Sequence, residues 1–354
     1  MLIVDKNLAA YKTTLDQSLR NAVERMNEVN ERIQMIVDTD SKLVGVLTDG
    51  DIRRSLLRGV TMDSPVRDAA CLDPTVGSYT DIDAANALWR QAKGKLRFLP
   101  LVDNAQVLCG LMVPATETTI IRQAAIMAGG YGSRLGSFTK DKPKPLVEVG
   151  GRPILDHILT RLESGGISKV FVCVHHLAES ISDFVGSRSN SADVRTFLEN
   201  TKLGTAGPLA KLAGSVDYAS GPLLVLNGDV ITNVDIRQIG HFHVEHGYDV
   251  TIGAAVHRFR IPYGVIHHDE DGRFVEVEEK PLVENFISAG VYVFNRQVLD
   301  LIEEDQQMDM PHLLNLTQKA GFRIGLFPIH EFWADIGQPQ DIETTNQHQH
   351  LWDA

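Results

Sequence analysis

The sequence predicts an α/β protein built on a mostly parallel sheet, preceded by a smaller repeated module. Three observations lead to this fold class. After residue 118, short apolar runs that suit buried strands recur, with helical patterns between several of them. The first of these runs, Ala124 to Ala128, passes directly into a glycine-rich turn. Residues 1–118 instead carry one pattern of helix and strands twice, which indicates an internal repeat.

Composition limits the classes of protein to consider. A chain of 354 residues with 43% hydrophobic residues suggests two domains and can supply a sizeable core. The net charge of −12 argues against a nucleic-acid-binding protein. Cys71, Cys109 and Cys173 lie far apart among apolar residues, so we expect buried thiols. Neither a signal peptide nor an apolar run of about 18 residues is seen, which favours a cytoplasmic protein without a membrane span.

The repeat occupies residues 1–118, and the last of these, from residue 114, belong to a short connector at residues 114–119. In the first copy we expect a helix at Leu15–Asn27, strands at Ile33–Asp38 and Lys42–Leu47, and a second helix from Thr48 through Leu57. In the second copy we expect a helix from Ile82 to Leu88 and strands at Phe98–Asp103 and Val107–Met112. Two such units should pack about a pseudo-twofold axis.

This repeat resembles a tandem pair of CBS domains, also called a Bateman module. In that family a G-x-x-T-x-x-D stretch binds the ribose and phosphates of an adenine nucleotide. Residues 45–51 match it fully, which makes Thr48 and Asp51 candidate ligand residues, whereas the second copy at residues 110–116 lacks both. Alternatively, Thr48 and Asp51 only cap the helix. Because CBS pairs often associate face to face, we also expect a homo-oligomer.

The α/β part, residues 119–354, begins with the strand at Ala124 and a loop rich in glycine. The loop contains Ala128, Gly129, Gly130, Gly132 and Ser133. Such a turn lets backbone N–H groups approach a ligand. Arg134 follows as a permanently charged fork suited to phosphate oxygens, and Lys144 lies between two prolines. Together they predict a pocket for a nucleoside triphosphate. Further strands are expected at Val170–Val174, Leu223–Leu226, Val250–Val256 and Gly290–Phe294.

The glycine-rich loop also permits two competing interpretations. A dinucleotide-binding G-x-G-x-x-G loop would need a glycine where Leu135 stands, and an acidic residue at the end of a second strand. Glu148 has about the right spacing but precedes a turn. A purely structural glycine turn would leave Arg134 and Lys144 without a function.

The run G-G-x-G-S-R-L followed by K-P-K-P-L and G-R-P resembles the signature of the sugar-1-phosphate nucleotidylyltransferases, and the similarity continues to the C-terminus. It implies a Rossmann-like, mixed but mostly parallel sheet with Arg134 and Lys144 as catalytic residues. The glycine loop would bind the nucleotide. Asp229 and Asp335 match the positions that ligate the catalytic metal, expected to be Mg²⁺, although each aspartate alone could be structural.

Glu199 with Gly204 and Thr205 forms the expected base subsite. The pattern E-x-x-x-L-G-T-A-G-P-L resembles the guanylyltransferase branch. A glutamate can accept from N1–H and the N2 amino group of guanine, which favours GTP. Glu199 could instead be a surface carboxylate, and a uridylyl or thymidylyl enzyme, more often with glutamine here, remains an alternative.

For the sugar, the resemblance implies Gly264, Glu279, Lys280 and Ser288. The family commonly has asparagine where Ser288 stands, so glucosamine, N-acetylglucosamine and mannose all stay open. We expect His241, His243 and His246 to be surface or packing residues, His175 and His176 to lie near the edge of the site, and His267 and His268 to lie on a hairpin surface.

The resulting hypothesis is a transferase that joins a nucleoside monophosphate, GMP from GTP or that of another NTP, to a sugar-1-phosphate and releases pyrophosphate. An adenine nucleotide on the repeat could regulate it. The alternative from another class is a catalytically inactive nucleotide-sensing protein. The joint presence of Arg134, Lys144, Asp229 and Asp335 speaks against that alternative.

Overall fold

The computed structural model describes residues 2–29, 31–92, 96–114 and 119–352. The chain divides into two compact units, Met1–Thr118 and Thr119–Ala354, called here the first and second unit. Most of the predicted connector, residues 115–118, lies outside the described residues. Within the described part, no helix has both the length and the apolar character needed to cross a membrane.

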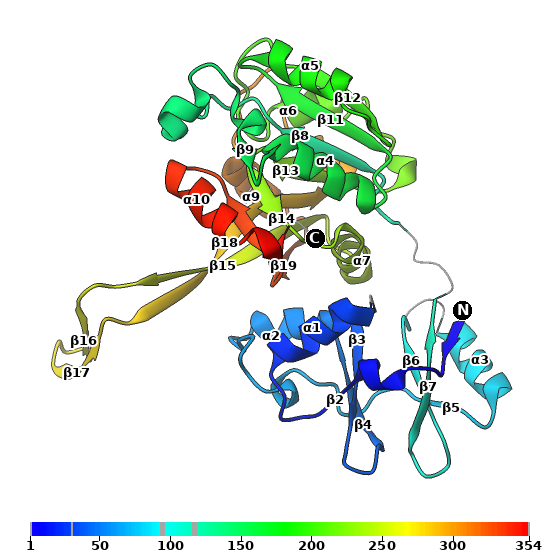
Figure 1. Ribbon diagram of the computed structural model, residues 1–354. Helices are drawn as coiled ribbons and strands as arrows, with labels where there is room; N and C mark the ends of the chain where they lie inside the picture. Colours follow the sequence, from blue (N-terminus) through cyan, green and yellow to red (C-terminus); the bar gives the residue numbers. More distant parts are fainter. Residues whose placement is uncertain (1, 30, 93–95, 115–118, 353–354) are drawn as a thin grey trace. The chain divides into compact units, whose positions relative to one another are not determined.

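The first half of the first unit is a helix–strand–strand–helix unit, as predicted (Figure 1). Its elements are α1 (Leu19–Val29), β3 (Ile33–Val37), β4 (Leu43–Thr48) and α2 (Asp49–Leu56), with β2 (Lys12–Thr13) beside β3. Helix α1 starts later than expected because the Ser18 hydroxyl accepts from the backbone N–H of Asn21 at 3.2 Å. Its apolar residues Leu19, Ala22 and Met26 are fully buried against the strands.

The second half repeats the helix and the two strands, and residues 115–118, which follow its last strand, lie outside the described residues. A four-stranded sheet has the order β1-β7-β6-β5, and α3 (Ile82–Gln91) packs against it. The strands are β1 (Leu2–Val4), β5 (Gly77–Ser78), β6 (Leu99–Val102) and β7 (Leu108–Val113). The described chain resumes at residue 119 and enters the next strand at residue 123.

One expectation about the cysteines was wrong. Cys173 is fully buried and Cys109 half-buried, but Cys71 is exposed. The backbone of Cys71 exchanges two hydrogen bonds of 2.9 Å with Val46, so its main chain extends the edge of the β3–β4 sheet. A short apolar neighbourhood in the sequence did not reveal that its side chain faces solvent.

The second unit is built on a seven-stranded sheet with the order β12-β11-β8-β13-β18-β15-β19. The strands are β8 (Gln123–Met127), β11 (Lys169–Val174), β12 (Asp193–Leu198), β13 (Leu223–Asn227), β15 (Val250–Arg260), β18 (Leu282–Phe294) and β19 (Ile324–Ile329). The pairings show that only β18 runs against the other six. The mostly parallel sheet was therefore predicted correctly, and its central strands β8, β11 and β13 carry apolar runs because both of their faces are covered.

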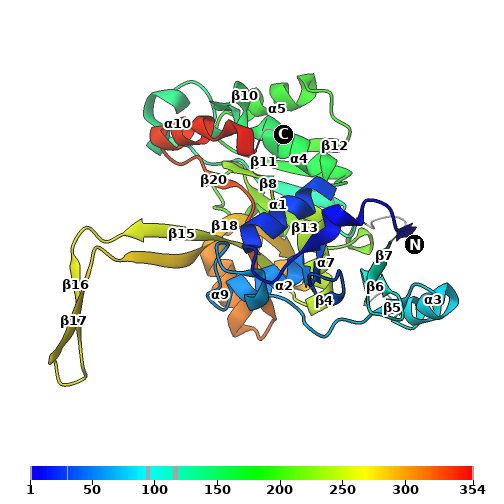
Figure 2. The same ribbon diagram turned by 60° about the horizontal axis from the view of Figure 1, so that its bottom comes forward.

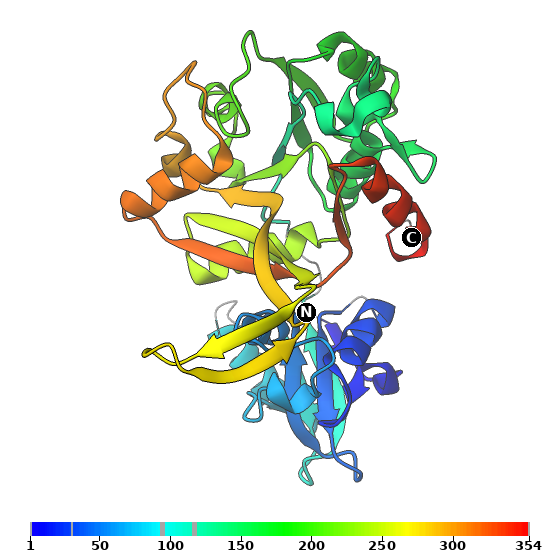
Figure 3. The same cartoon turned by 90° about the vertical axis from the view of Figure 1, so that its left-hand side faces the viewer.

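Helices cover the two faces of this sheet (Figures 1 and 3). Buried residues of α4 (Ile154–Ser164), α5 (Ala178–Ser187), α7 (Ile236–His246) and α10 (Pro339–Gln347) join one core cluster, and those of α6 (Pro208–Leu212), α8 (Arg296–Leu299) and α9 (Met310–Lys319) join the other. A short ribbon of β14 (Val230–Thr232) and β20 (Trp333–Asp335) lies at the carboxyl edge of β13.

A two-stranded arm leaves the sheet at β15 and β18 (Figures 1, 2 and 3). Beyond the last pair with β19, Ala255 with Ile329, strand β15 pairs only with β18. The arm ends in a hairpin of β16 (Gly264–His268) and β17 (Phe274–Glu279). Its apolar side chains are exposed, among them Ile266 at 65% and Phe274 at 67%.

Candidate functional site

The glycine loop forms the centre of the candidate site. It follows β8, where Ala128 N–H donates to the carbonyl of Cys173 in β11 at 2.9 Å. Gly132 has φ +66°, and a Cβ there would lie 2.9 Å from the Cβ of Lys144. Only glycine fits this position without displacing Lys144. Ser133 then starts a short 3-10 helix, Ser133–Thr139, that carries Arg134.

Lys144 and Asp229 form an ion pair inside the site. The Nζ atom of Lys144 donates to Oδ2 of Asp229 at 2.5 Å. Lys144 is 8% exposed, and Pro143 and Pro145 flank it at a single 3-10 turn, Lys144–Leu146. Asp229 lies two residues after the end of β13, at the edge where a parallel sheet presents its ligand-binding loops.

Asp335 and Arg134 complete the cluster. The β14–β20 ribbon pairs Val230 with Asp335, which brings Asp335 beside Asp229. A Cβ added at Gly337 would lie 3.6 Å from Asp335 Oδ1 and 3.8 Å from Arg134 Nη2. The structure therefore brings together all four residues expected to act in catalysis and metal binding, although they come from three segments that are far apart in the sequence.

The cluster holds two neighbouring carboxylates, Asp229 and Asp335, whose negative charges repel each other. Asp335 keeps contact with solvent, but the protein atoms packed around its carboxyl group raise its pKa, and the charge of Asp229 raises it further. Lys144 and Arg134 act in the opposite sense. In addition, Asp229 Oδ1 is buried and has no hydrogen-bond partner within the described chain. Two carboxylates in mutual repulsion with an unsatisfied oxygen are a donor set that suits a hard divalent cation.

Glu199 lies on the other side of the glycine loop. It follows β12, is 5% exposed, and its Oε2 accepts from the N–H of Leu203 at 3.3 Å. A Cβ at Gly129 would lie 2.9 Å from Glu199 Oε1, so the carboxyl group faces the loop. Burial raises the pKa of Glu199, while the Leu203 N–H and His175 lower it. Glu199 is thus not the surface carboxylate that the sequence left open.

His175 and His176 lie at this edge of the site. His175 Nδ1 forms a 3.0 Å hydrogen bond with the carbonyl oxygen of Glu199, and Tyr131 of the glycine loop lies 4.9 Å from the ring of His176. The other histidines have packing or surface positions, as expected. His243 is buried and bonded to Thr251 and Asn295, and His267 is exposed on the arm.

Gly204 and Thr205 have a visible packing function. Gly204 has φ +80°, and a Cβ there would lie 2.5 Å from the carbonyl oxygen of Met308. The Thr205 hydroxyl accepts from the N–H of Met310 at 2.7 Å and so caps the start of α9. This loop is therefore held against residues 308–310.

The four residues expected to bind the sugar are divided between two places. Ser288 lies in β18, where its hydroxyl bonds that of Tyr292 at 2.6 Å. Gly264, Glu279 and Lys280 lie on the exposed arm, where Gly264 pairs with Glu279 and the Lys280 Nζ is 3.9 Å from Glu279 Oε1. The structure brings Ser288 to the sheet but keeps the other three with one another on the arm.

In the first unit, Thr48 and Asp51 form a capping box at the start of α2. The Asp51 N–H donates to Thr48 Oγ1 at 3.2 Å, and the Thr48 N–H donates to Asp51 Oδ2 at 2.9 Å. Asp51 also pairs with Arg54 at 2.5 Å. The capping function is thus present, and it does not by itself exclude a ligand.

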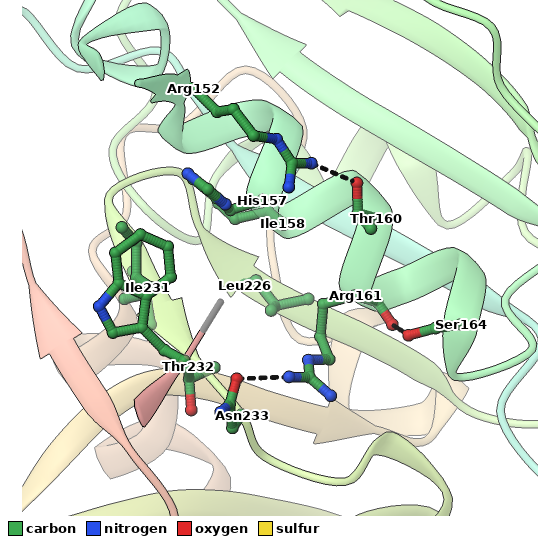
Figure 4. Close-up of a pocket in the computed structure, with 12 residues that line it drawn as sticks. Arg152, His157, Ile158, Thr160, Arg161, Ser164, Leu226, Ile231, Thr232 and Asn233 are labelled. Atoms are coloured by element: carbon green, nitrogen blue, oxygen red, sulfur yellow. Dashed lines mark hydrogen bonds between the residues drawn. The ribbon is translucent and has the colours of Figure 1, made fainter. Parts of the chain in front are cut away.

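A cavity of about 280 Å³ lies beside α4, and residues 230–232 of β14 form part of its lining (Figure 4). Arg161 donates to Asn233, and Arg152 donates to Thr160 at 3.0 Å. The Trp352 ring, 4.9 Å from that of His157, forms part of the lining. The cavity lies among strand, helix and C-terminal residues rather than at the four charged side chains.

Sequence reasoning missed Asn227, Tyr292 and Trp333. Trp333 Nε1 donates to the carbonyl oxygen of Ala289 at 2.8 Å, which joins β20 to β18. Asn227 ends β13, two residues before Asp229, and its Oδ1 is buried without a partner in the described chain. Its position in the run Asn227-Gly228-Asp229 was the available signal.

Two models of known protein families match this chain. A family model described as nucleotidyl transferase matches residues 123–350, and one described as CBS domain matches residues 11–58. The catalytic subunit beta of mannose-1-phosphate guanylyltransferase from Drosophila melanogaster is 37% identical over 227 residues, which are 63% of this chain and 61% of that protein. Mannose-1-phosphate guanyltransferase from Saccharomyces cerevisiae is 36% identical over 228 residues, 61% of this chain and 62% of that protein.

The chain thus spans about three fifths of the length of these curated relatives. Among solved structures, HddC from Yersinia pseudotuberculosis complexed with GMP-PN superposes with a TM-score of 0.51. The match has 23% sequence identity and covers 64% of this chain and 99% of that one. At this identity the likeness concerns the fold alone.

Proposed function

The chain belongs to the nucleotidyl transferase family and contains a CBS domain, and from this premise we propose that its second unit transfers GMP from GTP to a sugar-1-phosphate. An oxygen of the sugar phosphate forms a bond to the α-phosphorus. The bond from that phosphorus to the oxygen bridging to the β-phosphate breaks, and pyrophosphate leaves. The attacking phosphate is already ionised, so the reaction needs no general base.

The observation that carries the proposal is the meeting of Arg134, Lys144, Asp229 and Asp335 at the carboxyl edge of the sheet. In-line displacement on a phosphate depends on positioning and charge neutralisation rather than on covalent catalysis. Arg134 and Lys144 would hold phosphate oxygens. The glycine loop from Ala128 to Ser133 would place backbone N–H groups beside them.

Members of this family typically use a divalent metal, and for this chain we propose Mg²⁺ held by Asp229 and Asp335. The buried, unpartnered Asp229 Oδ1 and the raised pKa of Asp335 support this assignment. When bound, the cation would neutralise charge on the triphosphate. Because Lys144 already engages Asp229 Oδ2, it would hold that carboxylate in place and leave Oδ1 for the cation.

For the base we propose guanine, with Glu199 accepting from N1–H and the N2 amino group. The burial of Glu199 beside Gly129 supports this choice, as does the chain's similarity in sequence to proteins named mannose-1-phosphate guanylyltransferase. Gly204 and Thr205 would shape the wall of this subsite. Gly264, Glu279, Lys280 and Ser288 would bind the sugar phosphate, for which mannose, glucosamine and N-acetylglucosamine are the candidates. In the first unit, Thr48 and Asp51 would bind an adenine nucleotide that regulates the transferase.

The test is pyrophosphate release from each of four NTPs with a panel of sugar-1-phosphates that includes mannose-1-phosphate. We expect turnover with GTP, and a loss of about 10²-fold or more in kcat for Asp229→Asn. Asp193→Asn is the matched control and should keep activity, because Asp193 begins β12 at the end away from Glu199. A folded wild type that releases no pyrophosphate with any pair of substrates would be the inactive nucleotide sensor instead.

A further inference from the structure

Asn227 is a polar residue of the site to which the reaction proposed above gives no task. It ends β13 and pairs in register with Met127, the last residue of β8. Its Oδ1 is buried and accepts no hydrogen bond within the described chain. A buried amide oxygen in this state is uncommon in a native protein and suits a ligand that donates to it.

The neighbouring strand is built to accommodate this side chain. Gly290 of β18 has φ +69°, and a Cβ there would lie 2.7 Å from Nδ2 and 2.9 Å from Cγ of Asn227. The register of β18 against β15 also shifts at this point, between the pairs Ile252–Tyr292 and Ala254–Ser288. A glycine and a bulge thus make room for an amide group whose oxygen has no partner in the described chain.

The order of the strands indicates which substrate would lie beside the Asn227 side chain. Glu199 follows β12 and His175 follows β11, on one side of the glycine loop after β8. Asn227 and Asp229 follow β13, and Ser288 belongs to β18, on the other side. If the base lies at Glu199 and the phosphates at the loop, the acceptor sugar must extend across β13 towards β18.

We propose that Asn227 is a specificity-determining residue that hydrogen-bonds a hydroxyl group of the sugar ring in the sugar-1-phosphate. The inference rests on the proposed function and adds to it the group that recognises the acceptor. A sugar hydroxyl can donate to Oδ1 and so satisfy the buried oxygen. The Ser288–Tyr292 hydroxyl pair lies beside Gly290 on the same strand and would border the same part of the sugar.

The experiment is a double-mutant cycle between residue and substrate. Wild type and Asn227→Ala are assayed with GTP and the best sugar-1-phosphate of the panel, then with its monodeoxy analogues. In the variant we expect KM for the sugar-1-phosphate to rise about three- to tenfold, with KM for GTP unchanged within about twofold. For the wild type, one monodeoxy analogue should have a higher KM than the parent sugar-1-phosphate. For the variant, that analogue and the parent compound should have the same KM.

Two further variants keep the test decisive. Asn227→Ser, which retains a short polar group, serves if the alanine variant does not fold. Asn315→Ala, on the exposed side of α9, is the matched control and should leave all constants unchanged. Deoxy penalties that are the same in wild type and variant would overturn the inference while leaving the proposed function intact.

Two other outcomes also decide. A rise in the Mg²⁺ concentration needed for half-maximal rate, with GTP and sugar affected equally, would place Asn227 at the metal and contradict the inference. A folded wild type without pyrophosphate release would remove the proposed function and this inference together.

Discussion

Asp335 carries a charge that the folded protein disfavours. Its surroundings and Asp229 raise its pKa above the ordinary value of 3.8. A raised pKa of an acid means that ionisation costs stability, fully above the folded-state pKa and not at all below the unfolded-state pKa. Asp335→Asn should therefore raise the melting temperature of the metal-free protein at neutral pH, while it abolishes turnover.

The gain should disappear as the pH falls below about 3.9, where the carboxyl group is protonated in the folded and unfolded states alike. Differential scanning calorimetry across pH measures this. Asp193→Asn is the control, because the hydrogen bond from Arg195 lowers the pKa of Asp193. Equal or lower stability of Asp335→Asn at neutral pH would show that Lys144 and Arg134 dominate the field at Asp335.

Glu199 should decide the choice of base rather than the rate. Glu199→Gln keeps the shape of the side chain but turns one acceptor into a donor, which faces the N1–H or N2 amino group of guanine. We expect kcat/KM for GTP to fall by about tenfold or more relative to UTP and dTTP. The exposed Glu304→Gln is the control. A wild type that already prefers UTP or dTTP would contradict the base assignment.

At the scale of one element, the glycine loop contains two residues that differ in what they tolerate. Gly132→Ala meets both a positive φ and the Cβ of Lys144, so we expect a loss of about 1–2 kcal/mol from the backbone alone. Gly130 has an ordinary φ, and a Cβ there would meet nothing within 4 Å, so Gly130→Ala should fold with unchanged stability. Thermal or urea unfolding compares the two; equal losses would mean that Gly132 is not constrained by its neighbours.

The central strands were predictable because buried strands consist mainly of apolar residues. Strands β8, β11 and β13 have apolar runs with no polar alternation, and Asp229 could be placed at a sheet edge from its position after such a run. The outer half of β15 was not predictable in this way. His257, Arg258 and Arg260 give no apolar pattern, and their strand exists because residues 282–285 pair with them.

The contacts of the site depended on register between distant strands. Nothing in the sequence near Asn227 shows that Gly290 lies against it, because β13 and β18 meet only in the folded sheet. Likewise, nothing in the sequence near Cys71 shows that its backbone pairs with Val46. The sequence motifs therefore predicted which residues would lie together. Which of their polar atoms lack a hydrogen bond depends on the pairing of distant strands, and this was not predictable.

At the scale of the whole molecule, ligand binding by the first unit can be tested separately from turnover by the second unit. If Thr48 and Asp51 bind an adenine nucleotide, the ligand should stabilise the first unit by about 2.7 kcal/mol at a hundredfold excess over Kd. Asp51→Ala should abolish the heat of binding of AMP, ADP and ATP in titration calorimetry. It should also cost about 1 kcal/mol through loss of the cap.

The matched control for this variant is Asp81→Ala. Asp81 caps α3 by accepting from the N–H of Ala84 at 2.9 Å, so this variant loses a cap in the same unit. It should keep the heat of nucleotide binding. Absence of heat in the wild type would leave Thr48 and Asp51 as helix-capping residues only.

The arm has a consequence for the local dynamics of the second unit. A ribbon of two strands without a covering layer is marginally stable in water, so its backbone hydrogen bonds should open without global unfolding. Amides of β16 and β17 should exchange with deuterium far faster than those of β13, which is buried on both faces. If Glu279 and Lys280 do hold the sugar phosphate, added sugar-1-phosphate should slow exchange in the arm. The rate at which these amides take up deuterium would then report occupancy of the acceptor subsite, independently of turnover.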